Sequence, residues 1–251
     1  MTRPAPLACE VGPAGQRIKV RAWVDLPVSV GNGAHATGRA CTFDGLEEEH
    51  IAIALGPFRR PLGGVPLVRL HSECLTGDVF GSRRCDCGPQ LEESMARIVT
   101  HGGYLVYLRQ EGRGIGLYAK LDAYRLQDHG LDTFEANRAL GFAEDARDYS
   151  AAAEMLVALG VARVDLITGN QEKVTGLEAG GVAVRRVVPT VLHVTAENAG
   201  YLEAKRARGF QFASCAEPVP KPDRHGAEWA SASEKRRREP EPSRPSSSSG
   251  L

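Results

Sequence analysis

The chain has 251 residues, a length that suits one large domain or two small ones, and a formal net charge of zero. Zero net charge removes the global electrostatic case for binding nucleic acid or a membrane surface. No apolar run approaches the ~20 residues needed to cross a bilayer. We therefore expect a soluble protein with no nucleic-acid or membrane partner.

The first third of the chain is predicted to be mostly β. Residues 1–15 are rich in Pro, Ala and Gly and are expected to form a loose N-terminus. From Ile18 to Val24 apolar and polar side chains alternate, which predicts a half-buried strand with its even-numbered side chains facing the core. Two further short strands are predicted over residues 51–55 and 65–70, each bounded by Gly or Pro.

The last of these strands runs into a stretch that holds three of the six cysteines, Cys74, Cys85 and Cys87, with the spacing Cys-x10-Cys-x-Cys. Structural zinc sites usually use four protein ligands, whereas catalytic zinc keeps three and leaves one position for water. Three cysteines favour the second kind. A metal with an open position lowers the pKa of water and makes hydroxide available, which is the chemistry of a hydrolase.

Two other interpretations of these cysteines stay open from the sequence. Either Cys85 or Cys87 pairs with Cys74 in a disulfide, or all three are buried free thiols. The first ten residues lack the apolar core of a secretory signal, so we expect a cytoplasmic protein in a reducing compartment, where disulfides rarely persist. Metal binding is therefore the preferred hypothesis.

A helix and a buried strand follow the cysteines. Gly88-Pro89 can open the helix, and Gly102-Gly103 ends it. The strand over residues 104–108 runs directly into a Gly-rich turn at residues 109–116 that contains two arginines. Free backbone N–H groups in such a turn favour phosphate binding, although a tight connection has the same pattern. The turn is not a Walker A loop, because no Gly-Lys-Ser/Thr follows.

The middle of the chain is predicted to contain two helices separated by a polar loop. The first helix spans residues 117–128 and places Leu117, Leu121 and Tyr124 on one side, where Tyr124 is most simply a core aromatic. Residues 131–137 are predicted to be the loop. Asp145 and Asp148 precede the second helix, over residues 152–159, and an Asp there can be explained as its cap.

Strands are predicted at residues 161–168 and 182–188, with a short helix at 174–179 between them and an amphipathic helix at 195–208 after them. Strands that alternate with helices predict an α/β fold: a mixed, largely parallel sheet with helices on its faces, preceded by a β-rich N-terminal part. Binding residues then collect where the strands end. Residues 211–251, dominated by Pro, Ser, Arg and Glu, are predicted to be a disordered tail.

Several long motifs occur in one order along the chain, which therefore resembles GTP cyclohydrolase II, the enzyme family that opens riboflavin biosynthesis. The resemblance covers about residues 65–209. The motifs are Arg-x-His-Ser-Glu-Cys-Leu-Thr-Gly-Asp at 69–78, Arg-Cys-Asp-Cys-Gly at 84–88, Arg-Gln-Glu-Gly-Arg-Gly-Ile-Gly-Leu at 109–117, Asp-Thr-x-Glu-Ala-Asn at 132–137 and Gly-Phe-x-x-Asp-x-Arg-Asp-Tyr at 141–149.

The resemblance implies a homodimer with a catalytic domain over residues 16–210, and a role for each matched residue. Cys74, Cys85 and Cys87 would hold one Zn2+. Asp145 would be the proton acceptor, Arg147 a nucleophile and Tyr124 an active-site helper. GTP, with Mg2+ on its triphosphate, would be bound by Arg69, Leu70, His71, Ser72, Glu73, Gln90, Glu111, Gly112, Arg113, Thr133, Thr168 and Lys173.

The implied reaction converts GTP and water into formate, pyrophosphate and 2,5-diamino-6-hydroxy-4-(5-phosphoribosylamino)pyrimidine, the first step of riboflavin biosynthesis. Attack of activated water at C8 opens the imidazole ring, a second attack releases formate, and a separate step cuts between the α and β phosphates. A guanidinium with a pKa of about 12 or above is a poor nucleophile. Stabilising phosphate charge is therefore the simpler role for Arg147.

One motif departs from the family. The usual Thr-Asn-Asn-Pro-x-Lys is Thr-Gly-Asn-Gln-Glu-Lys at residues 168–173, without the rigid Pro and one Asn beside Lys173. Two alternatives follow: a paralogue that opens the imidazole ring but retains the formyl group, and a non-catalytic zinc nucleotide-binding module. Two roles are also considered for His71: a residue beside the metal, or an ordinary core histidine.

Overall fold

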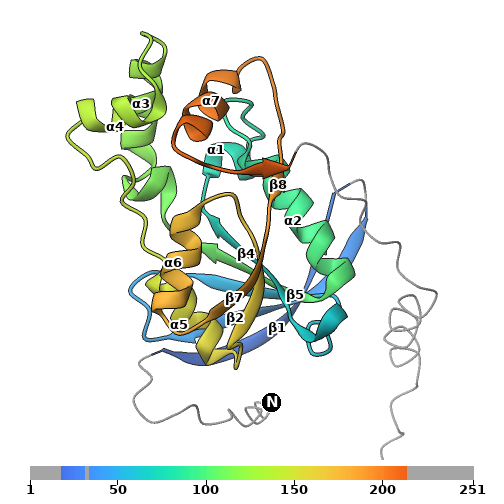
Figure 1. Ribbon diagram of the computed structural model, residues 1–251. Helices are drawn as coiled ribbons and strands as arrows, with labels where there is room; N and C mark the ends of the chain where they lie inside the picture. Colours follow the sequence, from blue (N-terminus) through green and yellow to red (C-terminus); the bar gives the residue numbers. More distant parts are fainter. Residues whose placement is uncertain (1–17, 32–33, 214–251) are drawn as a thin grey trace, which may run out of the picture. The chain divides into compact units, whose positions relative to one another are not determined.

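The computed structural model describes residues 18–31 and 34–213 of the chain. Its centre is a seven-stranded mixed sheet in the order β1-β2-β3-β5-β4-β6-β7 (Figure 1). The predicted loose N-terminus, residues 1–15, and residues 214–251 of the predicted tail lie outside the described residues. Regular structure continues past residue 210, because β9 (Phe212–Ala213) pairs in parallel with β8 (Thr190–Val191).

The N-terminal strands build the antiparallel part of the sheet, which confirms the predicted β-rich beginning. β1 (Lys19–Ser29), β2 (His35–Asp44) and β3 (Ile51–Leu55) pair antiparallel in chain order, and β3 pairs antiparallel with β5 (Gly103–Leu108). The sequence analysis missed β2. Its central residues are small or polar, so the strand carries little of the alternation that identifies a half-buried strand.

The predicted facing of β1 is wrong beyond its first residues. Ile18 is 2% exposed as expected, but Val24 is 59% exposed and Trp23 packs against the core instead. The register of β1 against β2 shifts between Val20 and Ala22. A single extra residue in one strand reverses the side-chain alternation beyond it, so the bulge moves the odd-numbered side chains to the inner face.

The parallel part of the sheet contains β5, β4 (Leu67–Ser72), β6 (Arg163–Ile167) and β7 (Ala183–Val188). The long helix α2 (Cys87–His101) packs Ile98 against the core on one face. The other core cluster contains buried residues of α5 (Ser150–Ala158) and α6 (Gln171–Ala179), among them Met155 and Leu177. This arrangement confirms the predicted mixed α/β sheet with helices on its faces.

The remaining helices lie beyond the carboxyl ends of the parallel strands (Figure 1). They are α1 (Leu75–Asp78), α3 (Leu117–Gln127), α4 (Thr133–Ala139) and α7 (Ala199–Ala207), together with the short 3-10 turn η2 (Glu111–Gly114) after β5. Another 3-10 turn, η1 (Leu62–Gly64), precedes β4 at the amino end of that strand. α4 contacts both α3 and α7. α7 begins four residues later than predicted, because Thr195 and Asn198 form a hydrogen-bonded turn before it.

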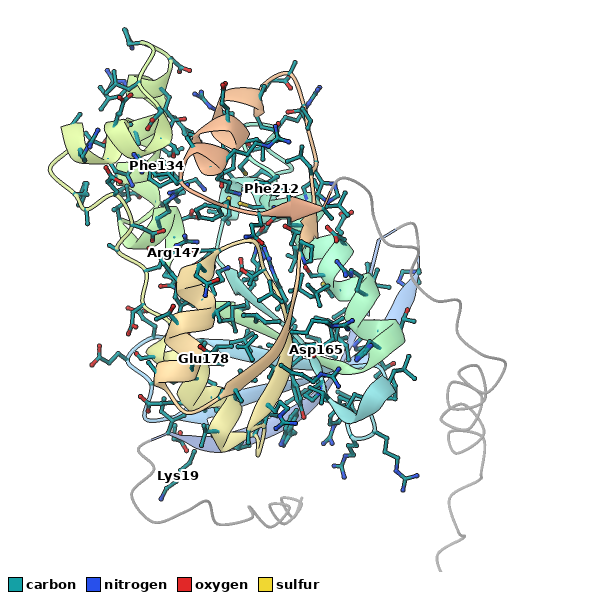
Figure 2. The ribbon with its side chains drawn as sticks, in the orientation of Figure 1. Lys19, Phe134, Arg147, Asp165, Glu178 and Phe212 are labelled. Atoms are coloured by element: carbon teal, nitrogen blue, oxygen red, sulfur yellow. The ribbon has the colours of Figure 1, made fainter. Side chains whose placement is uncertain are left out.

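The predicted polar loop at residues 131–137 is wrong, since most of it forms α4. The Asp132 carboxylate accepts hydrogen bonds from Phe134 N at 2.7 Å and Glu135 N at 2.8 Å, and Glu135 Oε2 accepts from Asp132 N at 2.9 Å. This reciprocal capping box satisfies the free amides of the first turn. Phe134 then points from α4 toward α7, where it is 4% exposed (Figure 2).

The expected Asp at the start of α5 is Asp148: the amide of Ser150, the first residue of the helix, donates to Asp148 Oδ1 at 3.0 Å, whereas Asp145 pairs with Arg147. The predicted facing of α3 is wrong. Leu121 is exposed, and the buried side of α3 contains Lys120 and Ala123 instead. Among residues 18–31 and 34–213, none of the helices combines the length and apolar character of a membrane span.

Candidate active site

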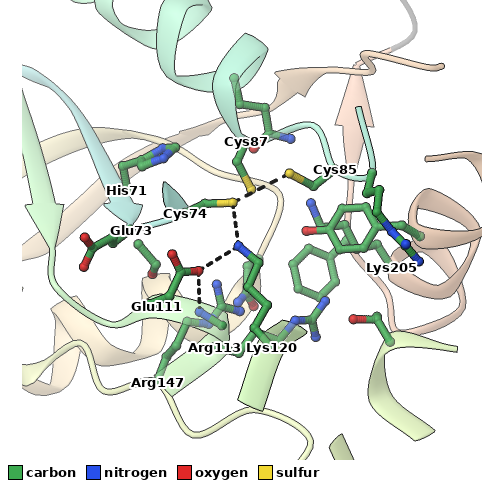
Figure 3. Close-up of a pocket in the computed structure, with 18 of the residues that line it drawn as sticks. His71, Glu73, Cys74, Cys85, Cys87, Glu111, Arg113, Lys120, Arg147 and Lys205 are labelled. Atoms are coloured by element: carbon green, nitrogen blue, oxygen red, sulfur yellow. Dashed lines mark hydrogen bonds and ion pairs between the residues drawn. The ribbon is translucent and has the colours of Figure 1, made fainter. Parts of the chain in front are cut away.

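The candidate active site is a pocket at the carboxyl ends of β4, β5 and β6, the edge where ligands of open α/β sheets bind (Figure 3). Its wall combines residues that are far apart in the chain. Those used below are Arg69, His71, Ser72, Glu73, Cys74, Arg84, Cys85, Cys87, Gln90, Glu111, Gly112, Arg113, Lys120, Tyr124, Thr133, Arg147, Thr168, Asn170, Lys173, Tyr201, Lys205, Phe210 and Phe212.

Three thiols gather on one side of the pocket. Cys74 precedes α1, Cys87 begins α2, and the Sγ atoms of Cys74, Cys85 and Cys87 all lie within 4.8 Å of one another. The Cys74 and Cys85 sulfurs are 3.7 Å apart, and all three cysteines are free. Disulfide sulfurs lie about 2.05 Å apart. The disulfide alternative is therefore excluded for this structure.

The donor set fits a zinc ion. Two sulfurs on a tetrahedral zinc with Zn–S bonds of about 2.3 Å lie about 3.8 Å apart, close to the Cys74–Cys85 separation. Gly77 makes room for this cluster, because a Cβ there would lie 2.8 Å from Cys85 Sγ and 3.1 Å from Cys74 Sγ. No other His, Cys, Asp or Glu of the described chain joins the group, so a bound ion would keep an open position.

The thiols differ in proton affinity. Hydrogen bonds from Cys85 and Cys87 lower the pKa of Cys74, and the nearby Lys120 ammonium lowers it further. The same hydrogen bond with Cys74 raises the pKa of Cys85 to about 11. Cys74 is therefore the thiolate of the group before any metal binds, and a thiolate is the form that ligates metals.

Lys120 and Glu111 connect the thiols to the Gly-rich turn (Figure 3). Lys120 Nζ donates to Cys74 Sγ at 3.0 Å and to Glu111 Oε1 at 2.7 Å. Glu111 Oε2 accepts from Leu75 N at 2.6 Å, at the start of α1. One buried ion pair thus holds the turn after β5 against the segment that carries Cys74.

Arg113 has a strained backbone. Its φ of 64° is the one positive φ of a non-glycine residue in the described part of the chain. Left-handed backbone costs an L-residue ~1 kcal/mol or more and persists where the surroundings impose it. The strain places the Arg113 guanidinium 3.9 Å from the Phe134 ring centroid, with NH1 buried and without a hydrogen-bond partner. Such a group is available for an anionic ligand.

Several cations converge in the same pocket. Arg69 donates to Ile167 O and Gln90 Oε1, and Lys173 Nζ donates to Leu70 O at 2.7 Å, so neither buried cation has a carboxylate partner. Burial lowers the pKa of Lys173, and the charges of Arg69, Arg147 and Lys205 lower it further. Concentrated positive charge in a pocket attracts a polyanion.

Asp145 and Arg147 form a bidentate pair, with Arg147 Nε donating to Asp145 Oδ1 at 2.8 Å. Burial raises the pKa of Asp145, but the Arg147 hydrogen bonds and charge outweigh it and hold that pKa below its ordinary value. For Arg147, burial acts to lower the pKa and the Asp145 partner reverses this, leaving a pKa above the ordinary value. Both groups are therefore ionised, and Arg147 lines the pocket while Asp145 lies behind it.

His71 lies at the pocket wall, and its imidazole is held by its neighbours. Nε2 lies 3.1 Å from the Asp78 carboxylate, and the ring stacks on Tyr107 at 5.5 Å. Asp78 Oδ2 in turn accepts from Cys74 N at 3.0 Å. Burial lowers the pKa of His71 despite the Asp78 hydrogen bond. His71 therefore supports the backbone of Cys74 through Asp78.

A family model of GTP cyclohydrolase II matches residues 25–189. The chain belongs to the GTP cyclohydrolase II family. The GTP cyclohydrolase-2 of Vibrio cholerae is 49% identical over 193 residues, 76% of this chain and 96% of that protein. The one of Aliivibrio fischeri strain MJ11 is 48% identical over 195 residues, 77% of this chain and 96% of that protein. The riboflavin biosynthesis protein RibBA of Thermotoga maritima is 54% identical over 158 residues, 63% of this chain and 40% of that protein.

This member of the GTP cyclohydrolase II family brings almost all of the predicted site residues to one pocket. Leu70 and Asp145 are the two predicted site residues outside the wall: Leu70 is fully buried and contributes its carbonyl to Lys173. Tyr124 lines the pocket, so its interpretation as a core aromatic is wrong. Its ring faces the Arg84 guanidinium at 4.5 Å.

Several wall residues were not predicted from the sequence. Lys120 had a signal, because it is the charged residue on the side of α3 that packs inward. The C-terminal residues had no such signal in the sequence, because their pattern is that of an ordinary amphipathic helix and the loop that follows it. The missed residues include Arg84, Lys120, Asn170, Tyr201, Lys205, Phe210 and Phe212.

Proposed function

We propose that the protein hydrolyses GTP to formate, pyrophosphate and 2,5-diamino-6-hydroxy-4-(5-phosphoribosylamino)pyrimidine, the first step of riboflavin biosynthesis. The observation that carries this proposal is one pocket that combines a three-thiol group with buried cations that have no carboxylate partner. A purine triphosphate needs both, because its ring is opened by hydrolysis while its phosphates require neutralisation.

Cys74, Cys85 and Cys87 would hold the zinc ion. Zinc bound there would supply Lewis-acid activation of water for attack at the purine ring. The protein's own contribution here is to favour the ionised form of Cys74 and to fix its position. Lys120 donates to Cys74 Sγ, and Asp78 accepts from the Cys74 amide.

Arg69, Arg147 and Lys173 would neutralise the triphosphate together with Mg2+. Asp145 fixes the orientation of Arg147 through two hydrogen bonds and, being ionised, is in the state required of a proton acceptor. Arg147 stays protonated because Asp145 raises its pKa, which favours charge stabilisation over nucleophilic attack. The remaining proposed GTP contacts are Leu70, His71, Ser72, Glu73, Gln90, Glu111, Gly112, Arg113, Thr133 and Thr168, with Tyr124 assisting beside the thiols.

The altered loop at residues 168–173 does not weaken the proposal. Asn170 Oδ1 accepts from Glu172 N at 3.0 Å and caps α6, while the Thr168 hydroxyl accepts from Asn170 N at 2.9 Å. An Asn N-cap supplies the helix start that the missing Pro would otherwise favour. Lys173 keeps its buried place in the pocket.

We also infer a cytoplasmic homodimer whose catalytic unit spans residues 16–210. Exposed apolar side chains on α3 and just after α1 support an association surface, since such residues are usually covered in an assembly. Val79 is 66% exposed, Phe80 73% and Tyr118 84%. Sedimentation of the purified protein measures its oligomeric state directly.

The decisive experiment incubates the purified protein with GTP and Mg2+, with and without a zinc chelator, and quantifies formate, pyrophosphate and product mass. One formate and one pyrophosphate per GTP, both lost with the chelator, is the expected result. A product that keeps the formyl group would identify the ring-opening paralogue instead. Binding of GTP without turnover, unchanged in a folded Cys85→Ser variant, would identify the non-catalytic module.

A further inference from the structure

The C-terminal segment β8–α7–β9 forms part of the active-site wall. The family match ends at residue 189, yet Tyr201, Lys205, Phe210 and Phe212 beyond it line the pocket. The segment is attached to the loop that precedes α6 and Lys173, because Gln211 N donates to Gly169 O at 2.9 Å. α7 therefore belongs to the site in this structure, and its contribution needs a physical explanation.

Lys205 is the charged group that α7 inserts. The residue is 8% exposed, and its Nζ lies 4.4 Å from the Tyr201 ring centroid, 5.9 Å from that of Phe210 and 6.0 Å from that of Phe212. Its ion-pair partner is Asp86, with Nζ and Oδ1 2.8 Å apart. The aromatic rings shield this pair from water, so its charges interact strongly.

Asp86 lies between two of the thiols, at the position that separates Cys85 from Cys87, and it is 0% exposed. Its second oxygen accepts from Gln90 Nε2 at 2.5 Å, and Gln90 Oε1 accepts from Arg69 NH2 at 2.8 Å. A continuous chain of hydrogen bonds thus runs from Lys205 on α7 through Asp86 and Gln90 to Arg69.

The charge balance shows why this carboxylate requires a cation. Asp86 is fully buried beside a thiol group and in a pocket that would receive a triphosphate, so its negative charge is repelled from two directions. Among the described residues, Lys205 is the cation within ion-pair distance of it. Removing one partner of a buried pair leaves an uncompensated charge, which is strongly unfavourable.

We propose that Asp86 and Lys205 form a positioning pair, through which α7 fixes the loop of Cys85 and Cys87 and orients Gln90 and Arg69 toward the triphosphate. The part of this proposal that concerns the triphosphate rests on the proposed function. The part that concerns the metal rests on the thiol geometry alone. Groups that support metal ligands from behind typically change metal affinity about 10- to 100-fold when removed. Lys205 is a positioning residue in this scheme, acting through Asp86.

The test compares full-length Lys205→Met, Asp86→Asn, the Asp86→Asn/Lys205→Met double variant and an Arg206→Met control. Arg206 is exposed on the same helix, so the control removes the same charge from the solvent side. Three quantities are measured: zinc affinity by competition with a chromophoric chelator, KM and kcat for GTP, and the rate of proteolysis within residues 190–213.

Lys205→Met is expected to lower zinc affinity about 10- to 100-fold, raise KM for GTP and speed proteolysis of the C-terminal segment. The double variant is expected to recover part of the zinc affinity, because the neutral amide that replaces the Asp86 carboxylate needs no cation and still accepts from Gln90. Arg206→Met should match the unsubstituted protein in all three quantities.

Equal zinc affinity and KM in Lys205→Met and Arg206→Met would overturn the proposal. If Lys205→Met does not fold, the double variant decides: a folded double variant supports the charge argument, and failure of both while Asp86→Asn folds overturns it. Absence of GTP turnover in the unsubstituted protein, with the zinc shift intact, would refute the proposed function and leave the positioning pair standing.

Discussion

Lys120 shows how much one buried side chain contributes to this site. Its ammonium donates to Cys74 Sγ and Glu111 Oε1, so it links the thiols to the turn after β5. It lies on the face of α3 that a simple amphipathic pattern would fill with apolar groups. The exception marks a functional position, because a buried charge persists only where partners compensate it.

Lys120→Met should therefore weaken zinc binding about 10- to 100-fold, since it removes the donor to Cys74 and leaves Glu111 with an unpaired charge. Competition with a chromophoric chelator measures this change. Lys19→Met, on the exposed start of β1, is the matched control. Unchanged zinc affinity in Lys120→Met would show that the 3.0 Å contact to Cys74 is incidental.

Lys173 should take up a proton when the triphosphate binds. In the free site, burial and neighbouring cations lower its pKa, so Lys173 loses its proton more readily than an ordinary lysine. A bound polyanion favours the charged form and raises the pKa, so protons move from buffer to protein on binding. Calorimetry with a non-hydrolysable GTP analogue, in two buffers of different ionisation enthalpy, measures this uptake.

Lys173→Arg is the control for that measurement, because arginine stays charged at any working pH. Its binding enthalpy should depend less on the buffer. Proton release on binding in the unsubstituted protein would contradict the expected sign. Equal buffer dependence in both proteins would assign the uptake to another group.

Among the elements, α4 was the one whose type the sequence analysis predicted wrongly. The Asp-x-x-Glu pattern at residues 132–135 is a capping box, and its polar residues suggested a loop. The helix matters for the site, because its Phe134 ring supports the strained Arg113. A local signal for a helix start was thus present and was outweighed by polar composition.

Asp132→Ala should lower the free energy of unfolding by about 1 kcal/mol, since two amides of the first turn of α4 lose their acceptor. Urea denaturation measures this loss. KM for GTP should rise as well, because a frayed α4 no longer supports Arg113. Asp122→Ala, on the exposed side of α3, should leave both quantities unchanged. Equal stability of the two variants would mean that tertiary contacts alone hold α4.

For the molecule as a whole, the thiol group connects the segment after β4 to the start of α2. Cys74 follows β4 and Cys87 begins α2, so a metal on their sulfurs would cross-link a strand end to a helix start. A metal that binds only the folded protein stabilises the folded state by its free energy of binding.

Chelation should consequently lower the melting temperature as well as abolish turnover. Differential scanning calorimetry of the protein, with chelator and then with excess zinc, measures the effect and its reversal. Added Mg2+ alone should not restore the transition, because thiolates select zinc over hard cations. An unchanged melting temperature after verified metal removal would contradict a cross-linking role.

Short-range patterns allowed most elements and most of the site to be predicted. The strands over residues 51–55 and 104–108 and the helix after Cys87 were confirmed. The two strands are short apolar runs next to a Gly, and the helix has apolar residues at helical spacing. The facing of β1 was not predictable, since a bulge depends on pairing with β2. The place of β4 between β5 and β6 likewise depends on pairing between distant segments.

The same division applies to the chemistry of the site. The spacing of Cys74, Cys85 and Cys87 and the Gly-rich turn are local features, so both can be recognised from the sequence. Lys205 lies 119 residues after Asp86, and no local pattern relates the two. Their pairing exists because folding brings α7 over the thiol loop, where a buried carboxylate requires a cation.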